Sequence, residues 1–487
     1  MALLDDENRL TVEFTSVSTG ADFTEYNIIV HVGNVQWAVK HRYKDFQCLH
    51  QRLTTNHGIS KHLLPPKKII GNKDPTFIER RRIDLQAYLQ GVVALMQRAI
   101  ADELAEFLLL PQYEMLYLGR SLASDQRFTS HQKQTQLTVL EMHAVSTIEL
   151  CASHPTSGGM HDMVQLAEGA ARMRSLTITG SWHKWRESNI IPNELEFNFN
   201  LFKKLHMLHL QDCNVLKITD ASSLRRSLVK LNAPGCGLQR ICDLLLCDAV
   251  HRYFSEEDME VLQSLPQWAP LKDLNLSNNA IASIDLSVSL CRKLETINLS
   301  GNKLSSLDYL TKLPYLISVV ASNNSIVELP DLHTKLGNLV HLDLSRNKMR
   351  SLIGLACLYS LVSLDVSSNL ITDIKEVEHL SKLPCLEDVV LTGNPVATIV
   401  DYRTKVLECF GSRCSEICLD LERPTQRELD KVAVLQALRS AKESNVSKLP
   451  VLSMTSPVLP LQVTASSTVL MPVPDLATAV EEATKLE

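Results

Sequence analysis

The sequence of 487 residues contains no run of about 18 apolar residues, the length that a membrane-spanning helix requires. Its first residues, Met1–Glu7, include acids where a signal peptide carries basic residues. The 12 cysteines form no Cys-x-x-Cys pair, and scattered thiols are typical of a reducing compartment rather than of a disulfide scaffold. We therefore expect a cytoplasmic protein whose contacts with membranes are peripheral.

The sequence also has no large excess of positive or of negative residues. Lys and Arg number 49 and Asp and Glu number 55, which gives a net charge of −6, whereas a nucleic-acid-binding protein is expected to be basic. The sequence has no P-loop, no Gly-x-Ser-x-Gly, no His-Glu-x-x-His and no kinase catalytic loop. The cluster of Cys409, Cys414 and Cys418 does not have the spacing of a zinc site. We predict no nucleic-acid partner, no enzymatic activity, no catalytic residue, no cofactor and no metal site.

The first 118 residues alternate in hydrophobicity and then become helical. Segments rich in Val, Ile and aromatic residues predict strands at 13–17, 26–32 and 35–43. Phe46, Leu49 and Leu53 then lie on one face of a helix, which the following prolines, Pro65 and Pro66, interrupt. Two further helices are expected, at about 75–96 and 99–110.

An internal repeat dominates the sequence from about residue 171. The template Leu-x-x-Leu-x-Leu-x-x-Asn-x-Leu begins at Leu271, Leu294, Leu316, Leu339, Leu361 and Leu386. Its asparagines are Asn279, Asn302, Asn324, Asn347, Asn369 and Asn394, and two weaker upstream copies carry Cys213 and Cys236 in that position. This pattern is typical of a leucine-rich-repeat solenoid, in which each copy supplies a short parallel strand and buries its apolar face against its neighbours. The asparagines are expected to bond backbone groups in the bend.

The sequence therefore predicts a multidomain chain. An α+β domain at 8–118 is followed by a connector at 119–170, an α/β leucine-rich-repeat solenoid at 171–400, a helical C-terminal cap at 401–444 and a disordered tail at 445–487. The cap is expected to cover the open apolar end of the solenoid. The long gap between Leu228 and Leu271 is interpreted as an irregular repeat or an insertion.

Basic residues gather in one part of the first domain. Residues 61–82 hold seven Lys or Arg against two Asp or Glu. Arginine suits phosphate, because its planar group donates to two oxygens at once. The segments Trp37–Phe46, Leu64–Lys67 and Ile78–Leu89 resemble, in that order, the phox-homology (PX) domain, over roughly residues 8–118.

The resemblance implies binding of phosphoinositides, most often phosphatidylinositol 3-phosphate on early endosomes. By position, Arg42 matches the family's ligand of the 3-phosphate, and Tyr43 matches the aromatic residue beneath the inositol ring. Lys67 matches the contact of the 1-phosphate, and Arg81 matches the arginine that binds the ring hydroxyls. His41 stands where many members have another arginine.

Similar loops of the family dip into the lipid surface. The loop here is expected to do so with Lys68, Ile69 and Ile70. Each basic residue near an anionic surface contributes on the order of 1 kcal/mol, so we expect reversible binding that a second contact would strengthen.

A PX domain followed by leucine-rich repeats resembles the nischarin (imidazoline receptor) family. Segments that match it are 39–46, 63–71, 333–338 and 401–407, and the likeness extends over about residues 8–440, whereas vertebrate members run far beyond this length. The resemblance implies an adaptor on early or recycling endosomes that restrains cell migration through small-GTPase or integrin signalling. Its candidate partners are an integrin tail, a Rac-type or Rab-type GTPase and p21-activated kinase.

The outward-facing residues of the predicted strands are the candidate surface for a protein partner. They are Asp273, Asn275, Asn298, Ser318, His341, Asp343, Arg346, Asp365 and Asp388. Two other functions fit the same sequence. One is a purely protein-binding scaffold without lipid binding, and the other is a regulatory subunit of a phosphatase or kinase, because small phosphatase regulators have similar repeats of 22 residues.

Overall fold

The computed structural model describes residues 9–19, 23–32, 35–67, 74–96, 100–123, 125–129, 134–151, 160–185, 190–247, 265–330, 332 and 336–446. These residues form two large apolar cores, one within residues 10–110 and the other between Leu122 and Val432. Residues 437–487 form a unit of their own, of which the last part of one helix is described. Among the described helices none is both long and apolar enough to cross a membrane.

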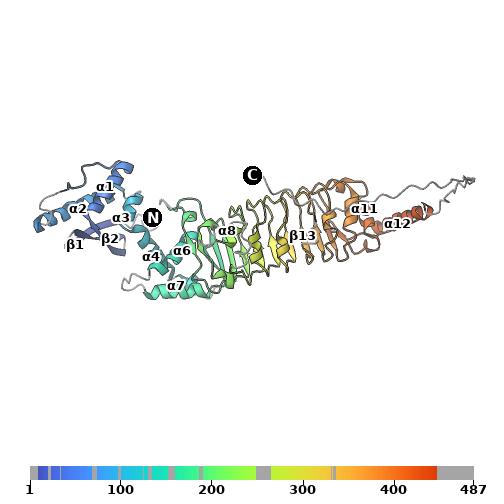
Figure 1. The fold of residues 1–487 in the computed structure, drawn as a ribbon, viewed down its shortest axis with the longest axis horizontal. Helices are drawn as coiled ribbons and strands as arrows, with labels where there is room; N and C mark the ends of the chain where they lie inside the picture. The colour runs from blue at the N-terminus through green and yellow to red at the C-terminus, as the bar shows by residue number, and fades with distance from the viewer. Residues whose placement is uncertain are drawn as a thin grey trace, which may run out of the picture. The chain divides into compact units, whose positions relative to one another are not determined.

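Three antiparallel strands and three helices build the first core (Figure 1). β1 (Leu10–Thr19), β2 (Thr24–Val32) and β3 (Val35–Arg42) pair in this order, and they precede α1 (Tyr43–His57), α2 (Pro75–Met96) and α3 (Asp102–Phe107). Alternate residues of the strands, such as Val12, Ile28 and Val39, are buried together with Phe46 of α1 and Leu85 of α2. The prediction of an α+β domain is confirmed.

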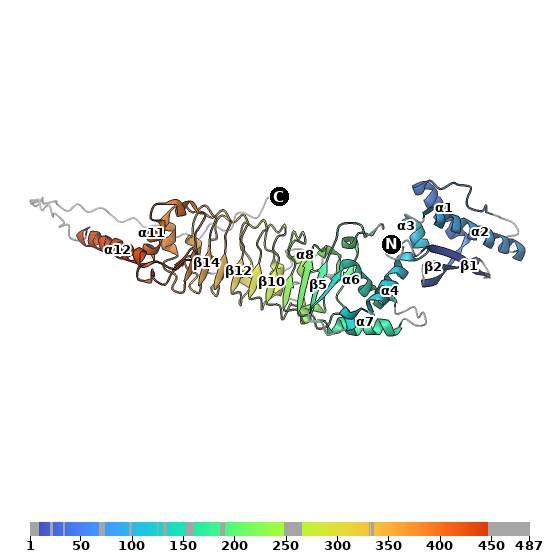
Figure 2. The same ribbon diagram turned by 180° about the vertical axis from the view of Figure 1, so that it is seen from behind.

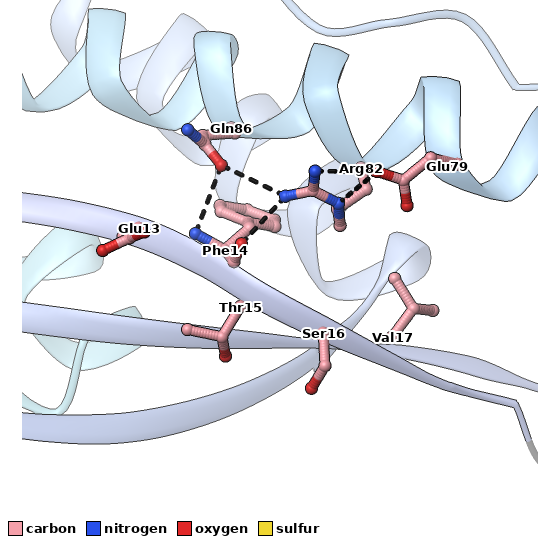
Figure 3. Close-up of a pocket in the computed structure, with 8 residues that line it drawn as sticks. All are labelled: Glu13, Phe14, Thr15, Ser16, Val17, Glu79, Arg82 and Gln86. Carbon is pink, nitrogen blue, oxygen red and sulfur yellow. Dashed lines mark hydrogen bonds and ion pairs between the residues drawn. The ribbon is translucent and has the colours of Figure 1, made fainter.

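β1 is an edge strand, and side chains of α2 occupy its open backbone groups (Figure 3). The strand bulges at Thr15. Just before the bulge, the Phe14 N–H donates to Gln86 Oε1 at 3.3 Å, and Arg82 Nη1 donates to the Phe14 carbonyl at 2.8 Å. Arg82 also pairs with Glu79 at 2.7 Å, and these residues line an open pocket of about 640 Å³. Backbone groups occupied in this way cannot pair with a strand of another molecule.

In the segment that follows the first core, the described residues form four helices and one strand. They are α4 (Leu110–Ala123), α5 (Gln126–Thr129), β4 (Thr135–Thr138), α6 (Val139–Cys151) and α7 (Met160–Arg172). α4 contributes to both cores, since Tyr113 packs against the first and Leu122 is buried in the second. β4 pairs in parallel with β5 (Ser175–Thr179). The solenoid sheet therefore begins inside the segment that we interpreted as a connector.

Within the described part of the chain, eleven parallel strands form the solenoid sheet, in chain order (Figure 2). After β4 and β5 come β7 (Met207–Gln211), β9 (Lys230–Asn232), β10 (Asp273–Asn275), β11 (Thr296–Asn298), β12 (Ser318–Val320), β13 (His341–Asp343), β14 (Ser363–Asp365), β15 (Asp388–Val390) and β16 (Cys418–Leu419). β6 (Phe197–Asn198) and β8 (Ile218–Asp220) form a separate parallel pair. Equivalent residues of neighbouring repeats lie side by side, since Thr296 is opposite both Asp273 and Ser318. The predicted leucine-rich-repeat solenoid is confirmed.

Short helices connect these strands. They are α8 (Cys242–Leu245) and 3-10 helices at Pro192–Glu194, Val215–Lys217, Leu224–Arg226, Leu286–Leu290, Leu310–Lys312, Ile353–Leu355, Ile374–His379, Pro395–Thr398 and Gly411–Arg413. The gap before Leu271 is an insertion rather than a repeat, because β9 pairs directly with β10. Residues 248–264 of this insertion lie outside the described residues.

The asparagine column binds each repeat to its predecessor. Asn324 Nδ2 donates to the carbonyls of Leu299 at 3.0 Å, Ala321 at 3.0 Å and Ser322 at 3.1 Å. Its Oδ1 accepts from the Leu304 N–H at 2.9 Å. The three carbonyls each accept a second bond, from Asn302, Asn347 or the Gly301 N–H. The Leu304 N–H has no other partner among the described residues, so without this side chain it would be buried and unpaired, which is costly. The structural role predicted for the column follows from these bonds.

Cysteine takes the asparagine position in two early repeats. The Cys213 thiol donates to the carbonyls of Ile178 and Gln211, both at 3.3 Å. Cys236 makes longer contacts, at 3.6 Å to the Leu210 carbonyl and 3.7 Å to the Pro234 carbonyl. A thiol is a weak donor, so these rungs are weaker than the asparagine rungs.

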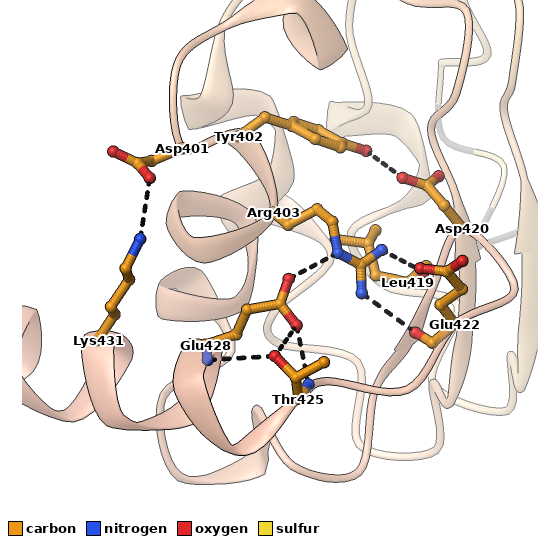
Figure 4. A network of polar contacts seen from close by, with 9 residues as sticks. All are labelled: Asp401, Tyr402, Arg403, Leu419, Asp420, Glu422, Thr425, Glu428 and Lys431. Carbon is orange, nitrogen blue, oxygen red and sulfur yellow. Dashed lines mark hydrogen bonds and ion pairs between the residues drawn. The ribbon is translucent and has the colours of Figure 1, made fainter.

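Helices close the last repeat (Figure 4). α11 (Tyr402–Cys409) precedes β16, and α12 (Gln426–Val446) follows it. Arg403 of α11 donates to the Leu419 carbonyl of β16 at 2.8 Å and pairs with Glu428 of α12 at 2.8 Å. Val432 of α12 is buried in the solenoid core. The helices that the sequence indicates after residue 401 thus cover this end.

Candidate functional site

The chain turns from β3 into α1 at Arg42, and the turn exposes this side chain. The Arg42 N–H donates to Asp45 Oδ2 at 2.9 Å, as the acid at the third position of a capping box does. The Arg42 side chain is 51% exposed, and its Nε lies 3.4 Å from Asp45 Oδ1. Within the described ranges no group bonds its two terminal nitrogens. They are therefore free to donate to a phosphate.

Arg81 of α2 is held between two aromatic rings. Its guanidinium carbon lies 4.3 Å from the ring centres of both Tyr43 and Phe77. Its Nη2 donates to the Pro66 carbonyl at 3.0 Å, and only 8% of the residue is exposed. A desolvated cation on an aromatic face contributes about 2 kcal/mol. Arg81 thus supplies positive charge to the cluster of Arg42, Tyr43, Lys67 and Arg81, which we call the PX groove after the role that the resemblance implies.

Tyr43 and Arg81 together fix the diproline segment that leads to Lys67. The Tyr43 hydroxyl donates to the Pro65 carbonyl at 2.5 Å, next to the Pro66 carbonyl that Arg81 bonds. Burial raises the pKa of Tyr43, against the opposing charge of Arg81, so the hydroxyl keeps its proton at neutral pH. Lys67 follows directly and is exposed. The structure therefore gathers Tyr43, Arg81 and the segment that carries Lys67, with Arg42 adjacent in the chain.

The three consecutive arginines near the start of α2 lie in different surroundings. α2 begins after Asp74, whose Oδ1 accepts from the Thr76 N–H at 3.0 Å. Arg80 is exposed, Arg81 lies in the groove and Arg82 covers the edge of β1. The predicted membrane-loop residues, Lys68, Ile69 and Ile70, lie outside the described residues.

His41 points into the core instead of the groove. Its ring stacks on Phe107 with centroids 3.7 Å apart, and Nε2 lies 2.7 Å from the Phe107 carbonyl. Burial lowers the pKa of His41 below its ordinary value, although the bond to Phe107 and the charge of Asp45 oppose the shift. This position therefore serves packing here, and it adds no positive charge to the groove at neutral pH.

Two contributors to the groove did not emerge from the sequence. Phe77 is the second ring against Arg81, and its spacing of four residues on a helix could have indicated the contact. His50 is buried and lies 3.2 Å from the Tyr88 hydroxyl and 3.3 Å from the Lys61 carbonyl. It ties the loop before the diproline segment to α2.

The solenoid strands carry most of the predicted partner residues. Their outer positions hold Asp273, Asn275, Asn298, Ser318, His341, Asp343, Asp365 and Asp388. Arg346 is not among them, because β13 ends at Asp343 and Arg346 occupies the following turn with φ of 55°. That prediction placed Arg346 on the strand face, which is wrong.

Several of these outer residues have a structural bond as well. Asn275, Asn298, Asp343 and Asp365 each accept, through Oδ1, from the N–H two residues later, at 2.8 to 3.0 Å. This bond closes a turn at the end of each strand. For the two aspartates no bond to the second carboxylate oxygen is found among the described residues.

Comparison with known proteins identifies both modules. The PX domain family matches residues 30–110, and the family of leucine-rich repeats (2 copies) matches residues 271–312. The "PX domain-containing protein kinase-like protein" of Rattus norvegicus is 40% identical over 95 residues, 19% of this chain and 16% of that protein, and the match is confined to the PX domain. The "Serine/threonine-protein kinase 11-interacting protein" of Gallus gallus is 28% identical over 258 residues, 48% of this chain and 24% of that protein.

Among solved structures, an internalin from Listeria monocytogenes has a TM-score of 0.32 and 16% identity over 48% of this chain and 64% of that one. This chain covers less than a quarter of the length of each of the two curated relatives named above. It combines a PX domain with leucine-rich repeats.

Proposed function

We propose that this protein is a non-enzymatic adaptor of the nischarin type. Its PX domain binds phosphatidylinositol 3-phosphate on early or recycling endosomes, and its leucine-rich repeats hold a protein partner at that membrane. Restraint of cell migration through small-GTPase or integrin signalling is part of this proposal. The candidate partners are an integrin tail, a Rac-type or Rab-type GTPase and p21-activated kinase.

One observation carries the lipid-binding half. Arg42 keeps two terminal guanidinium nitrogens unbonded within the described ranges, beside the stack of Arg81 on Tyr43. An exposed arginine fork next to an aromatic ring and a second cation suits a phosphorylated ring, since the fork binds two phosphate oxygens and the ring packs on an apolar face. Lys67 offers a further ammonium group from the fixed diproline segment.

Liposome co-sedimentation of the full chain over a panel of phosphoinositides tests this half. Arg42→Gln should lower affinity for the 3-phosphate lipid at least 10-fold. Arg52→Gln is the matched control, because Arg52 is an exposed arginine of α1, the helix that follows Arg42, and its partner is Glu106. It should change affinity less than twofold. Equal, salt-sensitive binding to every anionic lipid, or equal losses in the two variants, would contradict the proposal.

A second function is a scaffold that binds proteins alone. It is favoured by the bonds that Tyr43 and Arg81 already make to the Pro65 and Pro66 carbonyls, because these bonds let the groove exist without a ligand. Absence of binding to every liposome, with the fold intact by circular dichroism, would favour this function. A third function is a regulatory subunit of a phosphatase or kinase, and co-purification of an active catalytic subunit with the full chain would distinguish it.

A further inference from the structure

An apolar row crosses three neighbouring repeats where the strands begin. Ile317, Val340 and Val362 directly precede β12, β13 and β14. The Val340 N–H donates to the Ile317 carbonyl at 2.8 Å, and the Val362 N–H donates to the Val340 carbonyl at 2.9 Å. The three residues are therefore direct neighbours. Ile317 is 41% exposed, and the two valines are half-buried.

Two tyrosines extend this surface, and charges bound it. Tyr315 and Tyr359, in the loops that lead into β12 and β14, are 62% and 57% exposed. The equivalent position before β11 holds Glu295, and the one before β15 holds Glu387. Aliphatic and tyrosine side chains gathered inside a polar boundary are characteristic of protein interaction sites.

Carboxylates stand beside the apolar row without cations to neutralise them. Asp343, Asp365 and Asp388 lie on β13, β14 and β15. Within the described ranges none of them has an ion pair, whereas Asp273 of β10 lies 3.9 Å from Lys230 Nζ. The acids of the later repeats therefore lie on the strand face without a cationic partner among the described residues, and a partner of opposite charge would be attracted to them.

We propose that Ile317, Val340 and Val362 form the docking site for a basic amphipathic helix of a protein partner. This rests on the proposed function, because it names the partner that the repeats would hold. Neighbouring strands lie about 4.8 Å apart, so the row spans about 10 Å. Residues i, i+4 and i+7 of a helix span about 10.5 Å. A helix that crosses the strands can thus place one apolar residue on each repeat.

The charges decide which helix fits. Lysines or arginines beside the helix's apolar stripe would lie over Asp343 and Asp365, about one helix width along the strands from the row. An acidic helix would be repelled by the same groups. The chain's own residues 447–487 hold four Asp or Glu against two Lys, so they do not have the charge that this surface selects.

Selection from a displayed library of random peptides of about 16 residues, on the full chain, tests the site. Peptides that the wild type retains should carry apolar residues at spacings of three and four together with Lys or Arg. Their affinity, by fluorescence anisotropy, should fall at least 10-fold in Ile317→Asp. It should fall several-fold in the combined Asp343→Asn and Asp365→Asn variant, which keeps the turn-closing oxygen. Ile353→Asp is the matched control, since Ile353 is 64% exposed in a 3-10 helix outside the strands, and it should leave affinity within twofold.

The other outcomes separate this site from the proposed function. Selected peptides that bind Ile317→Asp and wild type equally would overturn the docking site and leave protein binding by the repeats standing. Enrichment of acidic peptides would overturn the choice of partner. If no peptide binds above background, both the docking site and the protein-binding half of the adaptor are refuted, while the liposome assay still decides the lipid-binding half.

Discussion

The PX groove and the strand face of the solenoid differ in how far binding residues also hold the fold. In the groove Tyr43 and Arg81 line the site and fix the Pro65 and Pro66 carbonyls. In the solenoid, side chains such as that of Asn324 bond the backbone and hold it in place. The apolar side chains of Ile317, Val340 and Val362 cannot form such bonds. A sequence motif can mark a site when the same side chains hold the backbone. Where the two tasks are separate, the motif marks the fold alone.

The largest expected effect comes from the solenoid ladder. Asn324→Ala leaves the buried Leu304 N–H without a partner among the described residues and removes one of two bonds from each of three carbonyls. It should lower the free energy of unfolding by about 3 kcal/mol, since an unsatisfied buried group costs about 1–3 kcal/mol and each other lost bond about 1 kcal/mol. Lipid affinity should not change, because the groove contains none of these residues. Urea denaturation and liposome binding of the same preparations check both statements.

Two variants control the ladder experiment. Asn338→Ala removes an exposed asparagine whose bond is to the Pro314 carbonyl at 3.3 Å, so it should cost less than about 1 kcal/mol. Asn324→Cys should be intermediate, because Cys213 occupies the same position naturally. Equal losses for Asn324→Ala and Asn338→Ala would show that the ladder bonds do not hold the repeats.

The next largest effect tests whether a residue of the PX groove both binds lipid and stabilises the fold. Arg81→Ala removes the stack on Tyr43 and Phe77 and the bond to Pro66. It should lower the free energy of unfolding by about 2 kcal/mol and weaken lipid binding as well. Arg42→Gln should weaken lipid binding alone. If denaturation shows that Arg81→Ala leaves stability unchanged, Arg81 does not hold the fold. The PX groove and the strand face of the solenoid would then not differ in this respect.

A smaller effect concerns the ends of the sheets. Arg403 donates to the Leu419 carbonyl of β16, and Arg82 donates to the Phe14 carbonyl of β1. Without Arg403, the Leu419 carbonyl would keep the Glu422 N–H, which donates to it at 3.1 Å. Arg82→Gln should cost about 1–2 kcal/mol and open β1 to pairing with a second molecule. Sedimentation velocity should then show concentration-dependent dimers. Arg80→Gln, an exposed residue of α2, should stay monomeric, and dimers in both variants would exclude the edge as their cause.

The smallest effect is a pH dependence at His41. Burial lowers its pKa from the ordinary 6.5, so the unfolded chain takes up the proton at a higher pH than the folded chain. Stability is therefore full above pH 7 and falls as the pH drops through 6.5 towards the lowered folded pKa. In His41→Gln, whose amide can donate to Phe107, the melting temperature should fall less between pH 7.5 and 5.5. His62→Gln, at an exposed position, should keep the wild-type dependence.

The sequence predicted what repetition and motif order determine. The leucines and asparagines recur at nearly constant spacing because each repeat meets an almost identical neighbour, so the strands from β10 to β15 were predictable. The PX motifs likewise located Tyr43 and Arg81, which the structure brings together.

The sequence did not predict features that lie where the repeats and motifs are no longer regular. β4 holds a single leucine, Leu137, because the first strand has only one neighbouring strand and is covered by helices. Arg346 fell outside the strand face because the strands are only three residues long here. The inward turn of His41 depends on Phe107, 66 residues away, and no local pattern reports such a contact.

The ladder of side-chain rungs also has a mechanical consequence. Each asparagine ties its repeat to the preceding one only, so a pulling force along the stack passes through the rungs in series. The rungs made by Cys213 and Cys236 offer thiols in place of amides and include contacts of 3.6 and 3.7 Å. Under tension the stack should therefore yield first among its early repeats, one step at a time, and the later repeats should remain assembled and still hold their load.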